Sequence, residues 1–312
     1  MNNMCVLVIR SNLNDKHAPS RGWGRASEQR VGAYRHVNSE KCDTMATAPG
    51  SAAVLLEDTW EASDIIEECS RLQIACSELT AGAMFNYDSE LFVQHTFMCD
   101  TAIVQKHLKL LGLENKVPDT YPKELESVMH RQIERRQLRE IVEADLPLFI
   151  KPTSNDKAFD GIVVRDAGGL QRVREEVGET ADELEVYAAE KVNFAVEYRL
   201  FVGNGTVYGT PGEHYVRDGD RSAGVPSDEF IQEIVKCCGD GFMAVDVGLM
   251  TKDEEQPLCN DNGVVKDYCP EDTWATWAVV EVNPPFALDD CGLAIEPYVQ
   301  FCIDSCAYIR GS

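Results

Sequence analysis

The chain has 312 residues, enough for a large core and for one to three subdomains. Its 53 acidic residues outnumber 29 Lys and Arg, and the formal charge of −24 argues against a broad surface for nucleic-acid phosphates, although a nucleotide needs only a few placed cations. No apolar run approaches the roughly 20 residues of a membrane-spanning helix, so we expect neither a nucleic-acid nor a membrane partner.

Residues 1–48 differ from the rest in being rich in Ser, Asn, Arg and Gly. We interpret them as a disordered or targeting leader, with an upstream extension before Met45 as another reading. The twelve cysteines are scattered and show no CxxC spacing, which predicts reduced thiols in a cytoplasmic protein. The alternatives are a disulfide framework, a Cys/His zinc site, and organelle targeting by residues 1–44.

Residues 49–120 alternate between strand and helix patterns, which predicts a small α/β domain at the N-terminal side. The expected elements are strands at Ala52–Leu56, Ile74–Ser77 and Leu91–Phe97, and helices at Ala62–Leu72 and Asp100–Leu111, the last ended by Gly112.

A break from Pro118 to Pro122 precedes the next segment, Glu124–Val142, which reads as one long helix. Four arginines occupy its polar positions, and we expect most of them to form a solvated face: Arg131, Arg135, Arg136 and Arg139.

A strand is predicted at Leu146–Pro152, with Lys151 near its end. It is followed by the polar, glycine-closed loop Thr153–Gly161, which contains Lys157, and by a second strand, Ile162–Val164. Strand, polar loop and strand together form a hairpin that can fold over a triphosphate. The alternative is a lysine that simply extends from a strand end into water.

A helical stretch, Leu170–Val177, leads into two strands within Leu184–Phe201. The connection Ala188–Val192 can present its backbone to an adenine edge. In the second strand Glu197 and Arg199 share a face, because residues two apart lie on the same side. They either pair with each other or contact a ribose and a phosphate.

Two later strands carry polar side chains among apolar ones. Phe242–Met250 contains a single acid, Asp246, and Trp277–Pro284 contains Glu281 and Asn283 on one face. Regular alternation places Val280 and Val282 on the opposite face.

The carboxylate and amide oxygens of Asp246, Glu281 and Asn283 are hard donors that suit Mg²⁺ completed by substrate phosphates. A lone carboxylate in an apolar strand is also costly to bury unless a cation compensates it. The alternative is a capping or salt-bridged aspartate and a solvated Glu–Asn pair.

In this order the pieces resemble the ATP-grasp superfamily, in particular a compact clade found in viruses, bacteria and eukaryotes. The similar segments read HRQIERRQLREI, LFIKPTSNDKAFDGIVV, EYRLFVGNGTVYG followed by HY, MAVDVG and WAVVEVNPPFAL. The resemblance extends from about Leu91 to Leu293. It implies an α/β (α+β) ATP-grasp fold over residues 121–312, with two lobes that clamp ATP and a polar insert at 251–273, preceded by a pre-ATP-grasp domain at 49–120.

The resemblance also implies roles for individual residues. Lys151 and Arg199 would be the catalytic pair, on the α/β-phosphates and on the γ-phosphate or an acyl phosphate. The nucleotide would further be held by Lys157 and Gly161 in the covering loop, by Glu190, Lys191 and Val192 at the adenine, by Glu197 at the ribose and by Arg131 at the phosphates. Asp246, Glu281 and Asn283 would hold Mg²⁺, with Mn²⁺ as a substitute, and His214 with Tyr215 would face the substrate.

The function implied is an ATP- and Mg²⁺-dependent carboxylate–amine ligase that joins small-molecule or peptide substrates through an acyl phosphate. A small-molecule phosphotransferase and a non-catalytic ATP-binding sensor are the alternatives. The stretch PPFALDDCG after Asn283 departs from the glycine- and aromatic-containing stretch of the clade, so the acceptor side is left open, as is the oligomeric state.

Overall fold

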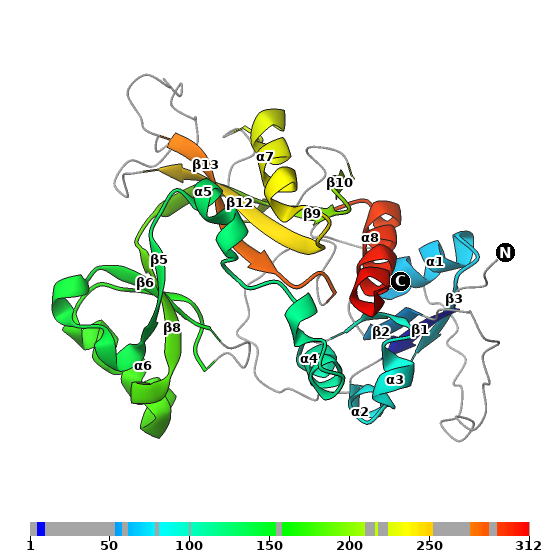
Figure 1. Cartoon of the computed structure of the whole chain (residues 1–312), viewed down its shortest axis with the longest axis horizontal. Helices are drawn as coiled ribbons and strands as arrows, with labels where there is room; N and C mark the ends of the chain where they lie inside the picture. The colour runs from blue at the N-terminus through cyan, green and yellow to red at the C-terminus, as the bar shows by residue number, and fades with distance from the viewer. Residues whose placement is uncertain are drawn as a thin grey trace, which may run out of the picture.

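The computed structural model describes residues 5–9, 54–57, 62–78, 81–99, 101–153, 158–209, 216–217, 224–251, 275–286 and 292–311. Three sheets account for most of the described chain, with a parallel sheet at the N-terminal end and two antiparallel sheets after it (Figure 1). Within these residues no helix combines the length and the apolar character needed to cross a bilayer.

The N-terminal unit is a parallel sheet in the order β3-β1-β2-β4. Its strands are β1 (Cys5–Ile9), β2 (Val54–Glu57), β3 (Ala75–Glu78) and β4 (Thr96–Met98), and its helices are α1 (Ala62–Arg71), α2 (Ala81–Phe85), α3 (Ser89–Phe92) and α4 (Thr101–Leu110). The α/β prediction for this unit therefore holds. The strand predicted at Leu91–Phe97 is wrong in its first half, where the chain is helical and the Phe92 ring stacks on His107, and strand structure begins only at Thr96.

Strand β1 comes from the segment that we assigned to the leader, so residues 5–9 belong to the N-terminal sheet. The domain boundaries at residues 48 and 120 stay predictions, as does the assignment of this unit as a pre-ATP-grasp domain.

The second sheet forms a small lobe in the order β5-β8-β6-β7. Its elements are β5 (Ile133–Gln137), β6 (Leu148–Pro152), β7 (Ile162–Val164), α6 (Ala167–Val177) and β8 (Glu185–Glu190), with single 3-10 turns at Leu138–Glu140, Glu143–Asp145 and Gly178–Glu183. Helix α6 begins where the Asp166 carboxylate accepts a hydrogen bond from the Gly169 amide, and it buries Leu170 and Val173 against the sheet.

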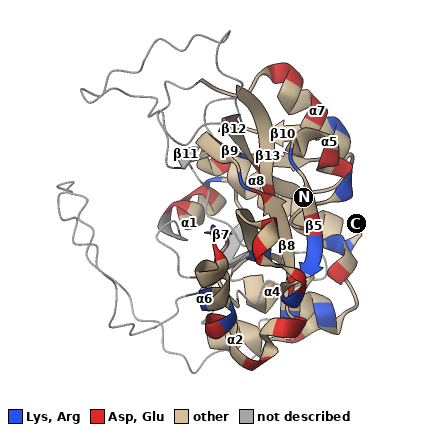
Figure 2. Ribbon diagram, turned by 90° about the vertical axis from the view of Figure 1, so that its left-hand side faces the viewer, with Lys and Arg blue, Asp and Glu red and all other residues tan. Residues whose placement is uncertain are grey.

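The helix predicted over Glu124–Val142 is wrong. Helix α5 (Glu126–Met129) ends at His130, which has a left-handed backbone with φ of 51°, and the chain then continues as β5, paired with β8. Arg and Glu favour helices by propensity, but here tertiary pairing outweighs that preference. Arg135 and Arg136 therefore lie on an edge strand, where Figure 2 shows basic residues along β5.

The third sheet is the central one, ordered β10-β9-β12-β13, with β11 paired to β9. Its strands are β9 (Asn193–Gly203), β10 (Thr206–Tyr208), β11 (Val216–Arg217), β12 (Met243–Thr251) and β13 (Ala275–Asn283). The predicted strands at Leu146–Pro152, Phe242–Met250 and Trp277–Pro284 correspond to β6, β12 and β13.

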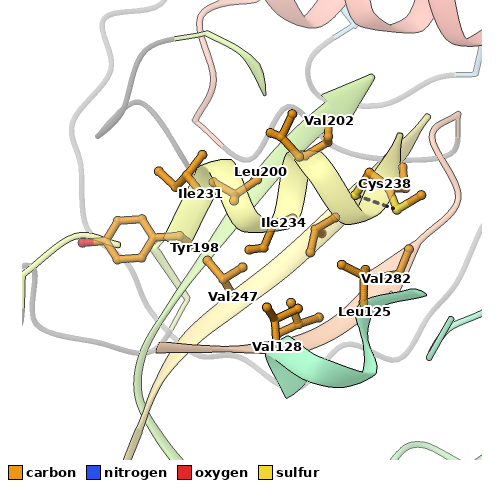
Figure 3. Packing of buried hydrophobic residues seen from close by; sticks show 14 of the residues in the cluster. Leu125, Val128, Tyr198, Leu200, Val202, Ile231, Ile234, Cys238, Val247 and Val282 are labelled. Atoms are coloured by element: carbon orange, nitrogen blue, oxygen red, sulfur yellow. Dashed lines mark hydrogen bonds between the residues drawn. The ribbon is translucent and has the colours of Figure 1, made fainter. Parts of the chain in front are cut away.

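One face of the central sheet is covered by helix α7 (Asp228–Cys238) (Figure 3). The Ser227 side chain caps the start of α7 by accepting from the Phe230 amide. The helix then places four buried residues on one side, at the spacing that an amphipathic helix requires: Ile231, Ile234, Val235 and Cys238. They pack against alternate residues of β9 and β12, including Tyr198, Leu200, Val245 and Val247.

The opposite face of the central sheet is shared between helix α8 (Ile295–Arg310) and the candidate site. Phe201 and Ala244 pack with Tyr298 and Phe301 of α8, and Ile65 of α1 belongs to the same cluster. Helix α8 thus connects the N-terminal unit to the central sheet (Figure 1). Beyond α8, the same face of β9 and β12 carries Arg199 and Asp246.

Candidate active site

Five of the residues selected from the sequence come together where the small lobe meets the central sheet. In the strand register Arg199 on β9 lies opposite Asp246 on β12, and Asp246 lies opposite Glu281 on β13. Asn283 follows two residues after Glu281, and Lys151 reaches across from β6 of the small lobe. The site is therefore built from three neighbouring strands of one sheet and one strand of another.

Asp246 is the most buried polar residue of the group, with 6% of its surface exposed. Arg199 donates to both of its carboxylate oxygens, from Nε at 2.7 Å and from Nη2 at 2.8 Å, and the Asn283 amide donates to Oδ2 at 3.0 Å. Burial raises the pKa of Asp246, and the contacts with Arg199 and Asn283 oppose that shift. The predicted choice between a paired Arg199 and a Glu197–Arg199 pair resolves in favour of Asp246 as a bidentate partner of Arg199.

Lys151 forms the link between the two lobes. Its Nζ donates to Glu281 Oε2 at 2.6 Å, and both side chains are partly exposed, at 28% and 20%. In this arrangement each acidic residue of the site has a cationic neighbour, Lys151 for Glu281 and Arg199 for Asp246. The same cations are of the type that binds phosphates.

The donor set fits a magnesium ion held jointly with a nucleotide. Among the residues that the structure describes, no group of three or more His, Cys, Asp or Glu side chains gathers as a metal site. Asp246, Glu281 and Asn283 supply instead two carboxylates and one amide on neighbouring strands, which is the sparse oxygen set that Mg²⁺ accepts when waters and phosphates complete its shell.

The cysteines show no sign of a zinc centre in the described part of the chain. The six cysteines whose side chains are described are free thiols: Cys69, Cys99, Cys237, Cys238, Cys302 and Cys306.

The remaining predicted nucleotide residues lie on elements next to this centre. Glu190, Lys191 and Val192 connect β8 to β9, and the Glu190 amide donates to Gln132 O at 3.1 Å. Glu197 lies opposite Gly248, two residues from Arg199. Their roles toward a nucleotide stay predictions.

The predicted covering loop lies in part outside the described residues. Gly161 directly precedes β7 and packs so closely on Phe149 that an added Cβ would lie 2.7 Å from the ring atom Cζ. Lys157, His214, Tyr215 and the insert 252–273 fall outside the described residues.

Arg131 takes a position that the sequence did not suggest. Its guanidinium donates to the backbone carbonyls of Val279 at 2.6 Å and Val280 at 2.5 Å, just before Glu281. The rings of Tyr121 and Phe194 lie 5.8 and 5.4 Å from its guanidinium carbon. Burial lowers the pKa of Arg131, but an arginine remains protonated.

Residues 119–121 were missed by sequence reasoning, and they tie the two sheets together. The Thr120 carbonyl accepts from the Val282 amide of β13 at 2.9 Å. Asp119 accepts from Arg135 and from the Tyr187 hydroxyl, both in the small lobe. Nothing in the sequence marks this segment beyond its two prolines, because its importance arises only from where it crosses.

A pocket of about 510 Å³ opens beside Arg131, next to the cluster of charged residues rather than within it. Its lining comes from the segment before β5 and from the start of that strand, and includes Tyr121, Lys123, Glu126, Arg131 and Gln132.

Comparison with known proteins decides the family. A model of the ATP-grasp domain, built for the second family of one clade of that superfamily, matches residues 128–301, which is more than half of the chain. The chain belongs to the ATP-grasp superfamily. The match spans the small lobe and the central sheet and includes Lys151, Arg199, Asp246 and Glu281.

Solved ATP-grasp structures resemble the chain at low identity. They include an ATP-grasp RimK domain protein from Sphaerobacter thermophilus (13% identity, TM-score 0.44, covering 80% of this chain and 98% of that one). D-alanine–D-alanine ligase from Bacillus anthracis (15%, 0.44, 83% and 97%) and N5-carboxyaminoimidazole synthase from Aspergillus clavatus (13%, 0.47, 80% and 76%) are also similar. No curated protein sequence matches the chain.

Proposed function

We propose that this ATP-grasp protein is an ATP- and Mg²⁺-dependent carboxylate–amine ligase. The single observation that supports this most is the meeting of Lys151, Arg199, Asp246, Glu281 and Asn283 at one point between the lobes. The site combines cations for phosphates with oxygen donors for a divalent metal, which is what phosphoryl transfer from ATP requires of a protein. Membership of the ATP-grasp superfamily supports the use of ATP.

The proposed reaction begins with transfer of the γ-phosphoryl group to a substrate carboxylate, which gives an acyl phosphate and ADP. An amine then attacks the acyl carbon, the new C–N bond forms, and inorganic phosphate leaves. The amine loses a proton in the process. A bound Mg²⁺ ion would neutralise phosphate charge and align the oxygens, held by Asp246, Glu281 and Asn283.

The protein's own groups have separate roles in this scheme. Lys151 would leave Glu281 and bind the phosphates when the nucleotide enters, since one ammonium group cannot serve both at full strength. Arg199 keeps the buried Asp246 ionised and presents a fixed positive charge on the same face. The predicted cover from Lys157 and Gly161 would exclude water and so protect an acyl phosphate from hydrolysis.

Turnover with pooled substrates tests this function. The full chain is incubated with Mg·ATP and with pools of small carboxylates and peptides, of amines, or of both, and ADP and phosphate are measured. ADP release that requires both pools supports ligation. Release with a single hydroxylated compound would indicate a phosphotransferase, and nucleotide binding without turnover in any pool would indicate a sensor; either result contradicts the ligase.

A further inference from the structure

The bulge in β13 is the feature that places Glu281 in the site. Asp246 pairs with Glu281, but the next residue on β12, Val247, pairs with Val279, so Val280 is one residue too many for the ladder. Before the bulge, Trp277 and Val279 face the α7 side of the sheet, in one cluster with Val247.

In a regular strand that pattern would turn Glu281 to the α7 side as well, because residues 277, 279 and 281 would share a face. The extra residue shifts the alternation. Val280, which the sequence placed on the face opposite Glu281, instead has a methyl group against Gly248, on the face that also carries Asp246. Val282 then returns to the core with Val245. The bulge thus lets the strand keep its valines buried while Glu281 lies beside Asp246.

Arg131 holds this bulge. Consecutive carbonyls of a regular strand point to opposite edges, and one guanidinium cannot reach both. Here Nη1 and Nη2 of Arg131 bind the carbonyls of Val279 and Val280 at 2.6 and 2.5 Å, so the two carbonyls are turned the same way. Nη1 also donates to Met129 O at 3.3 Å, which fixes the guanidinium to the end of α5.

We propose that Arg131 is a positioning residue that fixes the bulge at Val280 and thereby aims Glu281 at the metal position. This inference rests on the proposed function, because it assigns Glu281 to the metal. It differs from a direct contact between Arg131 and the phosphates, and the two roles predict different losses. A positioning residue affects metal affinity, whereas a phosphate ligand affects nucleotide affinity even without metal.

Arg131→Lys separates these roles. Lysine keeps the charge but not the planar fork that reaches two carbonyls. We expect the affinity for Mn²⁺, measured by electron paramagnetic resonance in the presence of a non-hydrolysable ATP analogue, to fall about 10-fold or more, as when outer partners of metal ligands are lost. Binding of the analogue in EDTA, measured by calorimetry, should stay within about 2-fold. Arg139→Lys, at an exposed position on the turn after β5, is the matched control and should change neither.

Deletion of Val280 provides the second test, because it removes the bulge and returns Glu281 to the α7 side. The folded deletion variant should lose Mn²⁺ affinity as fully as Glu281→Ala. If Arg131→Lys keeps the wild-type Mn²⁺ affinity, or if it loses analogue binding in EDTA, the positioning role is wrong. The same conclusion follows if a folded deletion variant binds Mn²⁺ normally; if it does not fold, Arg131→Lys alone decides.

Failure of the proposed function gives a different result. The wild-type protein would then bind neither Mn²⁺ nor the analogue. In that case amide hydrogen exchange of β13 still tests the role of Arg131, since exchange there should rise in Arg131→Lys and not in Arg139→Lys. Equal exchange in the two variants would overturn the inference.

Discussion

Replacing Asp246 by Asn should destabilise the protein strongly, because it leaves Arg199 charged and without its carboxylate. The two side chains are only 9% and 16% exposed and are joined by two hydrogen bonds of 2.7 and 2.8 Å. Removing one partner of such a buried pair costs about 3–5 kcal/mol, since the remaining charge is poorly solvated. Because both side chains keep slight access to water, we expect a loss near the lower end, about 3 kcal/mol.

Urea unfolding followed by tryptophan fluorescence measures this loss, with Trp277 in β13 as a reporter. Glu185→Gln is the matched control. Its ion pair with Arg135 is 3.5 Å long with half-exposed side chains, so its loss should cost less than about 1 kcal/mol. Replacing Asp246 and Arg199 together by Leu should cost less than the two single substitutions added. The reasoning fails if Asp246→Asn costs no more than Glu185→Gln, or if the single effects simply add.

Three further predictions follow from the structure. Lys151→Ala and Glu281→Ala should each abolish ATP consumption while the circular dichroism spectrum stays unchanged; near-normal turnover in either folded variant contradicts that residue's role. His107 is fully buried and burial lowers its pKa, so it is neutral when folded; stability is complete above about pH 6.5 and falls as the pH drops below it, which urea midpoints should show in wild type and not in His107→Gln. Gly248→Ala places a Cβ 2.5 Å from a ring carbon of Phe194 and should cost about 1–3 kcal/mol, whereas Gly82→Ala, which meets nothing within 4 Å, should be neutral or stabilising in thermal unfolding.

The strands that carry the site could be predicted because each combines an apolar run with a single polar interruption. Asp246 stands alone in β12, and Lys151 closes the short apolar strand β6. Periodicity was sufficient there, since each of these strands is paired on both sides within its sheet and its side chains follow the regular alternation.

Two features could not be predicted, and both depend on contacts distant in sequence. The segment from Arg131 to Gln137 reads as a helix because its residues favour helices, and only pairing with β8 makes it a strand. The bulge at Val280 leaves no mark in a run of valines, because it arises from the register with β12 and from the guanidinium of Arg131.

The central claim is that Asp246, Glu281 and Asn283 bind one divalent ion beneath a nucleotide clamped between the lobes. The most direct measurement is a crystal structure of the protein with Mn²⁺ and a non-hydrolysable ATP analogue, using anomalous scattering to locate the metal. We predict a metal peak about 2.0–2.3 Å from oxygens of these three residues and in contact with the phosphates. An ordered nucleotide bound elsewhere, or a metal peak that none of the three side chains contacts, would contradict the account.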